Sequence, residues 1–319
     1  MRNAVAALLA AALALGGCVT LPVPSLRRAA RALPPELAAA YHYPPISLQA
    51  KITSREMRSG YSLERLELSA PDSADRPIRL DWYKPEGKTQ AGRLPLVLIS
   101  PILAGNDLYI REFAAFYAAR GMHAVIVYRQ KEPFSADRPL KDVEEHLKQT
   151  IIEMRRTLDW MVTQESVDPQ RIGTFAISLG AILTAILAAV EPRVRCSVLG
   201  LPAGHVAEII MTSKDKSLRK KRRAVLQHQG WDQQKGLKEL QAVISSEPMR
   251  FAGAVDPGRV LIIAGLFDRV LGLGRSLDLW RAMGRPRLIL LPTGHYSAYL
   301  ATPYLKMATY SFLRRHLSG

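Results

Sequence analysis

Apolar and polar positions alternate in two short stretches that begin near residue 60, and apolar runs recur after them. "YSLERLELSA" and "PIRLDWYKP" have the period of two that is typical of half-buried strands. "LPLVLISPIL" (94–103) is a continuous apolar run, which indicates a strand covered on both faces. Five more strands are predicted: "HAVIVYRQ" (123–130), "RIGTFAIS" (171–178), "RCSVLGLP" (195–202), "RVLIIAGL" (259–266) and "RLILLPT" (287–293).

Helical patterns separate these strands. A long amphipathic helix is predicted from about 140 to 165, and further helices are predicted at 107–120, 179–190, 274–283 and 303–316. Strands that alternate with helices predict an α/β fold with a mainly parallel central sheet flanked by helices. The first two strands have no helix between them and are expected to form an antiparallel edge.

Residues from about 203 to 257 interrupt this alternation and are predicted to be a helical insert, or cap. The insert contains "KDKSLRKKRR", from Lys214 to Arg223, with seven basic residues and one acidic residue. This stretch can be the solvated face of a cap helix, or it can contact anionic, phosphate-bearing lipid headgroups. The sequence leaves both interpretations open.

The chain begins with "MRNAVAALLAAALALGGC", whose apolar run is too short to span a bilayer comfortably. The last four residues, Leu15 to Cys18, resemble the lipobox of a bacterial lipoprotein signal. That resemblance implies that residues 1–17 are a signal peptide, that cleavage precedes Cys18, and that Cys18 is acylated. The residue after Cys18 is Val19 and not Asp, and by resemblance to the sorting rules of double-membrane bacteria this favours the outer membrane, facing the periplasm, in a host with two membranes.

Residues 18–50 are predicted to be a lipidated tether, because six prolines fall between positions 22 and 45. The composition supports this envelope setting only indirectly. The formal net charge of +16 favours anionic partners, and for an envelope protein we expect lipid rather than nucleic acid. Cys196 lies in an apolar run and is predicted to be a core residue. The oligomeric state is not predicted.

The stretch "FAISLGAIL" (175–183) places Ser178 between a buried strand and an apolar helix. A nucleophilic serine on such a sharp turn is usually written G-x-S-x-G, with small flanking residues because strand and helix approach closely. Here Ala176 replaces the first glycine and Gly180 keeps the second. The N–H of Leu179, at the helix start, is expected to face a developing oxyanion.

A serine hydroxyl needs a base, and two later strand ends can supply one. Asp268 follows the strand in "LIIAGLFDRV", and His295 follows the strand in "LILLPTGHYS". Both positions are carboxyl ends of strands, where ligands gather in open α/β sheets. Ser178, Asp268 and His295 are therefore predicted to form a catalytic triad in the order serine, acid, histidine. Tyr296 beside the histidine can line a pocket or pack as an aromatic residue.

Other chemistries have less support. No His, Asp or Glu cluster in the sequence has metal-ligand spacing, and no Gly-rich loop with Lys-Ser/Thr suggests a phosphate cradle. No metal and no cofactor are expected.

Together, "FAISLGA", "AGLFDRV" and "PTGHYS" resemble the α/β-hydrolase superfamily, with closest similarity to its dienelactone-hydrolase/esterase-like branch. The resemblance implies that residues 51–319 form a hydrolase domain carrying the insert. It also implies a second oxyanion N–H in the loop after the third strand. That loop reads "SPILAGN" and has Pro101-Ile102 in place of the usual His-Gly, so Leu103 is the first candidate donor and Ile102 the second. A serine nucleophile argues against the thiol chemistry of dienelactone hydrolysis.

The leading hypothesis is a serine hydrolase of carboxylic esters at the bacterial cell envelope. Amide and thioester substrates use the same machinery and stay open, as does acyl transfer to a hydroxyl acceptor. A non-catalytic binding protein on the same fold is the alternative from another class. A third hypothesis is that the basic insert docks to anionic lipid and that catalysis is vestigial.

Overall fold

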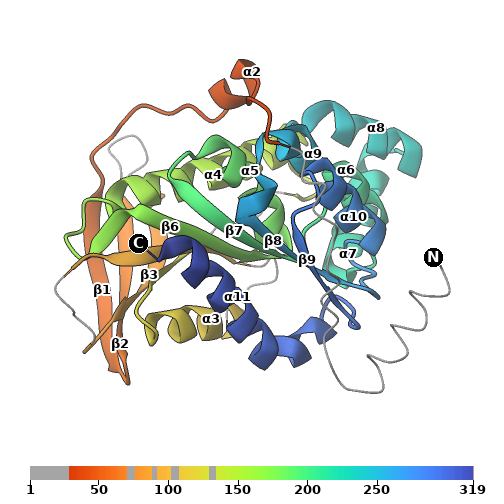
Figure 1. The fold of residues 1–319 in the computed structure, drawn as a ribbon. Helices are drawn as coiled ribbons and strands as arrows, with labels where there is room; N and C mark the ends of the chain where they lie inside the picture. The colour runs from red at the N-terminus through yellow and green to blue at the C-terminus, as the bar shows by residue number, and fades with distance from the viewer. Residues whose placement is uncertain (1–28, 70–75, 88–91, 102–107, 129–133, 319) are drawn as a thin grey trace, which may run out of the picture.

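A nine-stranded sheet runs through the computed structural model, which describes residues 29–69, 76–87, 92–101, 108–128 and 134–318. The strand order is β1-β2-β3-β5-β4-β6-β7-β8-β9, and Figure 1 shows the sheet between β1 at one edge and β9 at the other. The strands are β1 (Gln49–Arg58), β2 (Tyr61–Ser69), β3 (Ile78–Pro85), β4 (Leu94–Ser100), β5 (His123–Tyr128), β6 (Val167–Ile177), β7 (Val194–Gly200), β8 (Val260–Gly265) and β9 (Arg287–Leu291).

The sheet has a parallel part and an antiparallel part. Strands β5, β4, β6, β7, β8 and β9 pair in parallel, whereas β1, β2, β3 and β5 pair antiparallel. The predicted mainly parallel sheet is confirmed, as is the antiparallel edge. Because parallel strands end at the same side, the loops after β6, β8 and β9 come together there.

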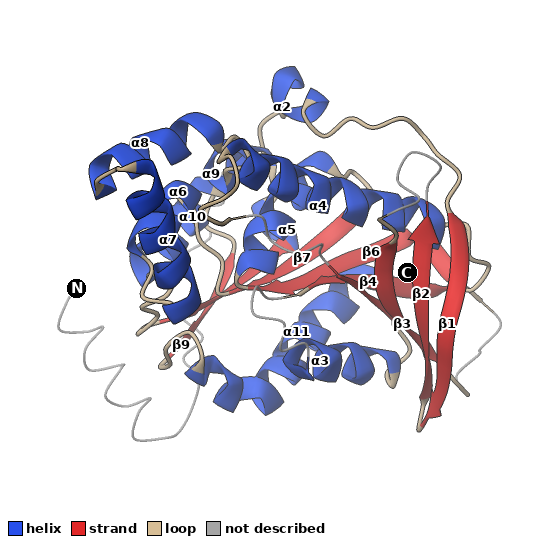
Figure 2. Cartoon of the chain, turned by 180° about the vertical axis from the view of Figure 1, so that it is seen from behind, coloured by secondary structure: helices blue, strands red, loops and turns tan. Residues whose placement is uncertain are grey.

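Helices cover both faces of the sheet (Figure 2). One face carries α4 (Lys141–Met161), α5 (Leu179–Val190) and α10 (Leu273–Ala282), and the other carries α3 (Leu108–Ala118) and α11 (Thr302–Leu317). Each helix turns apolar side chains toward the strands, so two apolar layers form. All five helices match predicted segments to within a few residues at each end.

Strand β1 is the one strand that the sequence did not reveal. Its residues read "QAKITSREMR", and nearly all of them are exposed or half-buried. An edge strand with both faces toward solvent has no apolar alternation, so its sequence lacks the usual signal. Its backbone pairing with β2 over the whole strand forms it instead.

The insert between β7 and β8 is helical, as predicted. It comprises α6 (Val206–Thr212), α7 (Lys216–Gln229), α8 (Gln233–Val243) and α9 (Pro248–Phe251). Glu144 of α4 fastens its far end by accepting hydrogen bonds from the N–H and hydroxyl groups of Ser245 and Ser246, at 2.5–3.0 Å. These charge-assisted bonds hold the insert on the body of the domain.

The described part of the expected tether is packed onto this body. Helix α2 (Pro35–Ala39) buries Leu37, and Tyr41 is fully buried with its hydroxyl 2.8 Å from that of Ser246. The folded body therefore begins before residue 50, because an aromatic anchor follows the prolines. Residues 1–28, with the expected signal peptide and Cys18, lie outside the described residues. No helix among those described combines the length and the apolar character needed to cross a membrane.

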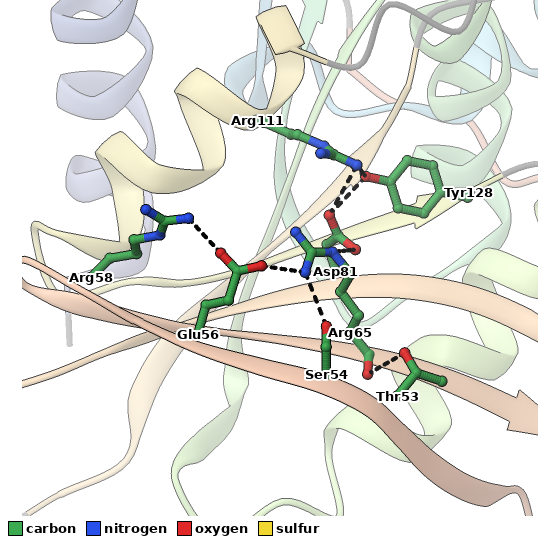
Figure 3. Close-up of polar contacts among 8 residues, drawn as sticks. All are labelled: Thr53, Ser54, Glu56, Arg58, Arg65, Asp81, Arg111 and Tyr128. Carbon is green, nitrogen blue, oxygen red and sulfur yellow. Dashed lines mark hydrogen bonds and ion pairs between the residues drawn. The ribbon is translucent and has the colours of Figure 1, made fainter.

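A polar network ties the antiparallel strands to α3 (Figure 3). Asp81 of β3 is buried, and its carboxylate accepts a hydrogen bond from the Tyr128 hydroxyl at 2.9 Å. The guanidinium groups of Arg111 and Arg65 lie 3.5 and 3.9 Å from the same carboxylate. Arg65 also binds Glu56 of β1. The network fixes α3, the helix that follows the predicted oxyanion loop.

Candidate active site

Ser178 lies on a sharp turn between β6 and α5. Its backbone has φ 58° and ψ −127°, a conformation that is costly for a residue with a Cβ. The N–H of Ser178 donates a 2.8 Å hydrogen bond to the carbonyl of Gly200, at the end of β7. Neighbouring strands thus hold the serine in a strained position at the carboxyl end of the sheet.

The small residues around Ser178 have different tolerances. A Cβ on Gly180 would lie 2.5 Å from the carbonyl oxygen of Ser100 and 2.7 Å from that of Pro101. Both atoms are backbone, so the position requires glycine. The methyl group of Ala176, by contrast, is fully buried among apolar residues between the sheet and α5. This difference explains why alanine can replace the first glycine of the motif.

His295 and Asp268 meet Ser178 in one hydrogen-bonded chain. The Ser178 hydroxyl lies 3.0 Å from Nε2 of His295, and Nδ1 of His295 lies 2.8 Å from Oδ2 of Asp268. The Asp268 side chain is almost fully buried and that of His295 is one-tenth exposed. The structure therefore brings together the three residues that the sequence singled out.

The environment keeps Asp268 ionised. Burial raises the pKa of the Asp268 carboxyl, but the hydrogen bond and charge of His295 and two backbone N–H groups outweigh it. The N–H groups of Val270 and Leu271 donate to Oδ1 at 2.8 and 3.0 Å, so the pKa ends below its ordinary value. An ionised Asp268 accepts a hydrogen bond from Nδ1–H of His295, which leaves Nε2 free to accept a hydrogen bond from the Ser178 hydroxyl.

The N–H of Leu179 belongs to the first turn of α5, where helix amides have no acceptor in their own helix. Leu179 directly follows Ser178, so its N–H lies at the positive end of the helix dipole. The candidates for the second donor, Leu103 and Ile102, lie outside the described residues.

A second histidine–carboxylate pair lies in the insert and α10. Nε2 of His205 lies 3.5 Å from Asp278, and both side chains are more than one-third exposed. In the part of the chain that the structure describes, no serine side chain hydrogen-bonds to this pair. His123 is buried, and its ring nitrogens lie 3.3 Å from Trp82 Nε1 and 3.1 Å from the Ser166 carbonyl. Burial lowers the pKa of His123 to about 4, so it is neutral.

The described residues include neither a metal-binding cluster nor a reactive thiol. Among the described residues, no group of three or more His, Cys, Asp and Glu side chains is placed to hold a metal ion. Cys196 is buried in the core, and burial raises the pKa of its thiol to about 12. The Cys196 thiol is therefore inert at neutral pH.

The insert contacts the loop that carries His295, and the sequence did not reveal this contact. Asp215, the N-cap residue of α7, accepts a hydrogen bond from Leu218 N–H through Oδ1 and from the Tyr296 hydroxyl through Oδ2. Tyr296 is two-thirds exposed, and its ring packs edge-on against the imidazole of His295, as a packing aromatic does. The N-cap Asp was a readable signal for the start of α7, but the pairing across 81 residues was not.

The sequence similarities to known proteins cover about half of the chain. No family model matches the chain. Two uncharacterized proteins of Mycobacterium tuberculosis, from strains CDC 1551 / Oshkosh and ATCC 25618 / H37Rv, are each 28% identical over 159 residues. The match covers 49% of this chain and about a third (35%) of the length of each of those relatives.

Solved structures resemble nearly the whole chain. An acetyl xylan esterase from Paenibacillus sp. R4 has a TM-score of 0.67 at 20% identity, covering 88% of this chain and 92% of its own. Acetyl xylan esterase 1 from Thermoanaerobacterium sp. JW/SL YS485 has a TM-score of 0.62 at 14% identity, with coverages of 91% and 99%. A cold-adapted esterase from an Arctic intertidal metagenomic library has a TM-score of 0.54 at 17% identity, with coverages of 86% and 100%. The chain has the α/β-hydrolase fold.

Proposed function

We propose that the protein is a serine hydrolase of carboxylic esters, with Ser178 as nucleophile, His295 as general base and acid, and Asp268 as its positioning carboxylate. The observation that carries the proposal is the continuous chain from Ser178 Oγ through His295 to Asp268, with links of 3.0 and 2.8 Å. The strained backbone of Ser178 adds support, because such strain persists where a fold holds a reactive group in place.

In the acylation step, Ser178 Oγ attacks the ester carbonyl carbon while Nε2 of His295 takes the hydroxyl proton. The carbonyl oxygen becomes an oxyanion, which the Leu179 N–H stabilises together with the second donor expected at Leu103. Asp268 stabilises the imidazolium. As the tetrahedral intermediate collapses, the alcohol leaves with the proton from Nε2, and the acyl group stays on Ser178.

Deacylation repeats these steps with water. His295 takes a proton from water, the hydroxide adds to the acyl carbon, and the bond to Ser178 Oγ breaks. The proton returns from Nε2 to Oγ, and a carboxylic acid is released. The names of two similar structures, acetyl xylan esterases, favour acetyl esters among the first substrates to try.

The test is labelling with a fluorophosphonate probe, which phosphonylates an activated serine. The chain starting at residue 18, with Cys18→Ser, retains every described residue. We expect labelling of this parent and complete loss in Ser178→Ala and His295→Asn. His205→Asn is the matched control, because His205 also pairs with a carboxylate and its left-handed backbone (φ 62°) suits asparagine. A folded parent that stays unlabelled would overturn the proposal.

We further propose that Cys18 is acylated and anchors the protein in the cell envelope. The lipobox-like run from Leu15 to Cys18 supports this. Two or more acyl chains give stable anchoring where one does not. Cells fed an alkyne palmitate analogue should incorporate it into the native chain and not into the Cys18→Ser variant, and native protein should fractionate with membranes. Equal labelling of both would contradict the assignment.

A further inference from the structure

The exposed large apolar side chains are not scattered over the molecule. Nine are exposed among the described residues, and seven of them lie around the carboxyl end of the sheet. We call these seven the apolar rim: Leu108, Phe267, Tyr296, Tyr299, Leu300, Tyr304 and Met307. Such a gathering marks an interaction site, whereas single exposed apolar residues are ordinary.

Two residues of the apolar rim are sequence neighbours of the proposed triad. Phe267 directly precedes Asp268, and Tyr296 directly follows His295. Leu300, Tyr304 and Met307 have i, i+4, i+7 spacing from the 3₁₀ turn Ser297–Ala301 into α11, so they share one face. Leu300 is 80% exposed, the largest value among them.

A line of cations lies on α7. Lys216, Arg219, Lys220 and Arg223 follow i, i+3, i+4, i+7 spacing and are all exposed, whereas Leu218, Arg222 and Val225 are buried on the opposite side. We call the four exposed residues the basic stripe. Within the described part of the chain, none of the four pairs with a carboxylate, so their charge faces solvent.

The two features adjoin. The hydrogen bond of 2.6 Å between the Tyr296 hydroxyl and Asp215 joins the apolar rim to the N-cap of α7. Both views show α7 and the beginning of α11 at the same end of the sheet, where β8 and β9 finish (Figures 1 and 2). An apolar patch bordered by cations is the arrangement of proteins that sit on anionic lipid surfaces.

We propose that the apolar rim and the basic stripe together form a docking face for an anionic lipid bilayer, which turns the carboxyl end of the sheet, with Ser178 and His295, toward the membrane surface. The rim side chains enter the headgroup region and the basic stripe binds lipid phosphates. The substrate class then follows: esters presented at the membrane surface, a point that rests on the proposed function. A second copy of this chain fits the face less well, because it would bring two basic stripes and two net charges of +16 together.

The experiment is vesicle flotation with the chain from residue 18 carrying Cys18→Ser and Ser178→Ala, so that neither an acyl anchor nor turnover contributes. Vesicles of phosphatidylcholine are compared with vesicles that also contain phosphatidylglycerol. We expect binding to the anionic vesicles only. Leu300→Asp, and separately Lys220→Glu with Arg223→Glu, should each weaken it about tenfold or more.

Two matched controls accompany these variants. Met57→Asp changes another exposed apolar residue, on β1 at the far edge of the sheet. Lys235→Glu with Lys238→Glu reverses two exposed charges on α8 of the same insert. Both should bind as the parent does. A polarity-sensitive dye on Leu300→Cys should shift to the blue on anionic vesicles, while the dye on Met57→Cys should not; Cys196 is buried and leaves one accessible thiol in each.

Three results would overturn the docking face: no vesicle binding, equal binding to uncharged vesicles, or binding that the charge reversals abolish while Leu300→Asp and the dye register nothing. The last result would leave electrostatic binding by the basic stripe alone, without the apolar rim. A dimer in solution that Leu300→Asp dissociates, without vesicle binding, would assign the face to a second copy instead. Fluorophosphonate labelling of the Ser178 parent needs no vesicle, so failure of the hydrolase proposal is seen separately.

Discussion

The parallel part and the antiparallel part of the sheet each have a buried aspartate, and the two aspartates bind different kinds of side chain. In the parallel part, Asp268 binds His295, which in turn reaches Ser178. In the antiparallel part, Asp81 binds Tyr128 and lies near the guanidinium groups of Arg65 and Arg111 (Figure 3). Both carboxylates are satisfied, so burial and hydrogen bonding alone do not distinguish a reactive site from a structural one.

The two sites differ in the chemistry of the side chain that lies beside the aspartate. An imidazole can accept a hydrogen bond at one nitrogen while it donates one at the other, so His295 links Asp268 to Ser178. A guanidinium stays protonated at all physiological pH values, so Asp81 can only hold β3, β5 and α3 together. The comparison therefore predicts that one end governs rate and the other governs stability.

Asp268→Asn should produce the largest effect. The amide cannot hold the Nδ1 proton as the carboxylate does, and the imidazole adopts the wrong tautomer for taking the serine proton. We expect kcat/KM for a soluble aryl acetate to fall by about 10⁴-fold with the fold retained. Asp278→Asn, beside His205, is the matched control and should leave the rate unchanged. A rate within tenfold of the parent for Asp268→Asn would remove Asp268 from the triad.

Gly180→Ala should disturb the same end through geometry. The added methyl group would overlap the carbonyl oxygens of Ser100 and Pro101, so the turn must shift relative to β4. A displacement of about 1 Å lowers kcat by about 10²-fold. Gly274→Ala in α10 meets no atom within 4 Å and serves as control. Steady-state kinetics should separate the two variants, and equal rates would mean that the turn is not held by this contact.

Asp81→Ala should lower the stability of the fold rather than the rate. The Tyr128 hydroxyl loses its acceptor and two guanidinium groups lose their carboxylate, but both guanidinium groups reach solvent. We expect the free energy of unfolding in urea to fall by about 2 kcal/mol, less than for a fully buried ion pair. Arg79→Ala, exposed on the same strand, should change it by less than about 0.5 kcal/mol. Unchanged stability with lost labelling would invalidate the division between the two ends.

Glu153 on α4 is a third buried carboxyl, and it tests the comparison through pH. Burial raises its pKa to about 7, against the opposing effects of Gln149 and of the charges of Arg156 and Arg76. Between about pH 4.5 and 7 the folded state therefore binds more protons than the unfolded chain, and stability falls as pH rises through this window.

Glu153→Gln should remove that slope. At pH 8 the variant should be about 1 kcal/mol more stable than the parent, since glutamine is also costly to bury; below pH 4.5 the gain should vanish. Thermal melts across this range measure it, with exposed Glu36→Gln on α2 as the control. A gain that is the same at every pH would mean that Glu153 does not titrate in this window.

Much of the fold was legible in the sequence because the buried elements carry periodic signals. Eight of the nine strands and the five helices that flank the sheet are at their predicted places. The exception, β1, is exposed on both faces and is defined by pairing with β2. The early start of the folded body was missed because Tyr41 anchors to Ser246, 205 residues away, and no local pattern encodes that contact.

The three proposed catalytic residues were likewise readable, because each follows a buried strand and parallel strands end at one edge. The sequence by itself determined the order of elements, the identity of Ser178, Asp268 and His295, and the basic character of α7. Only the tertiary structure decided which histidine–carboxylate pair meets a serine, why position 180 requires glycine whereas position 176 accepts alanine, and that the apolar rim adjoins the basic stripe. These depend on distances between residues far apart in the chain, which are set when the sheet closes and the insert packs on it.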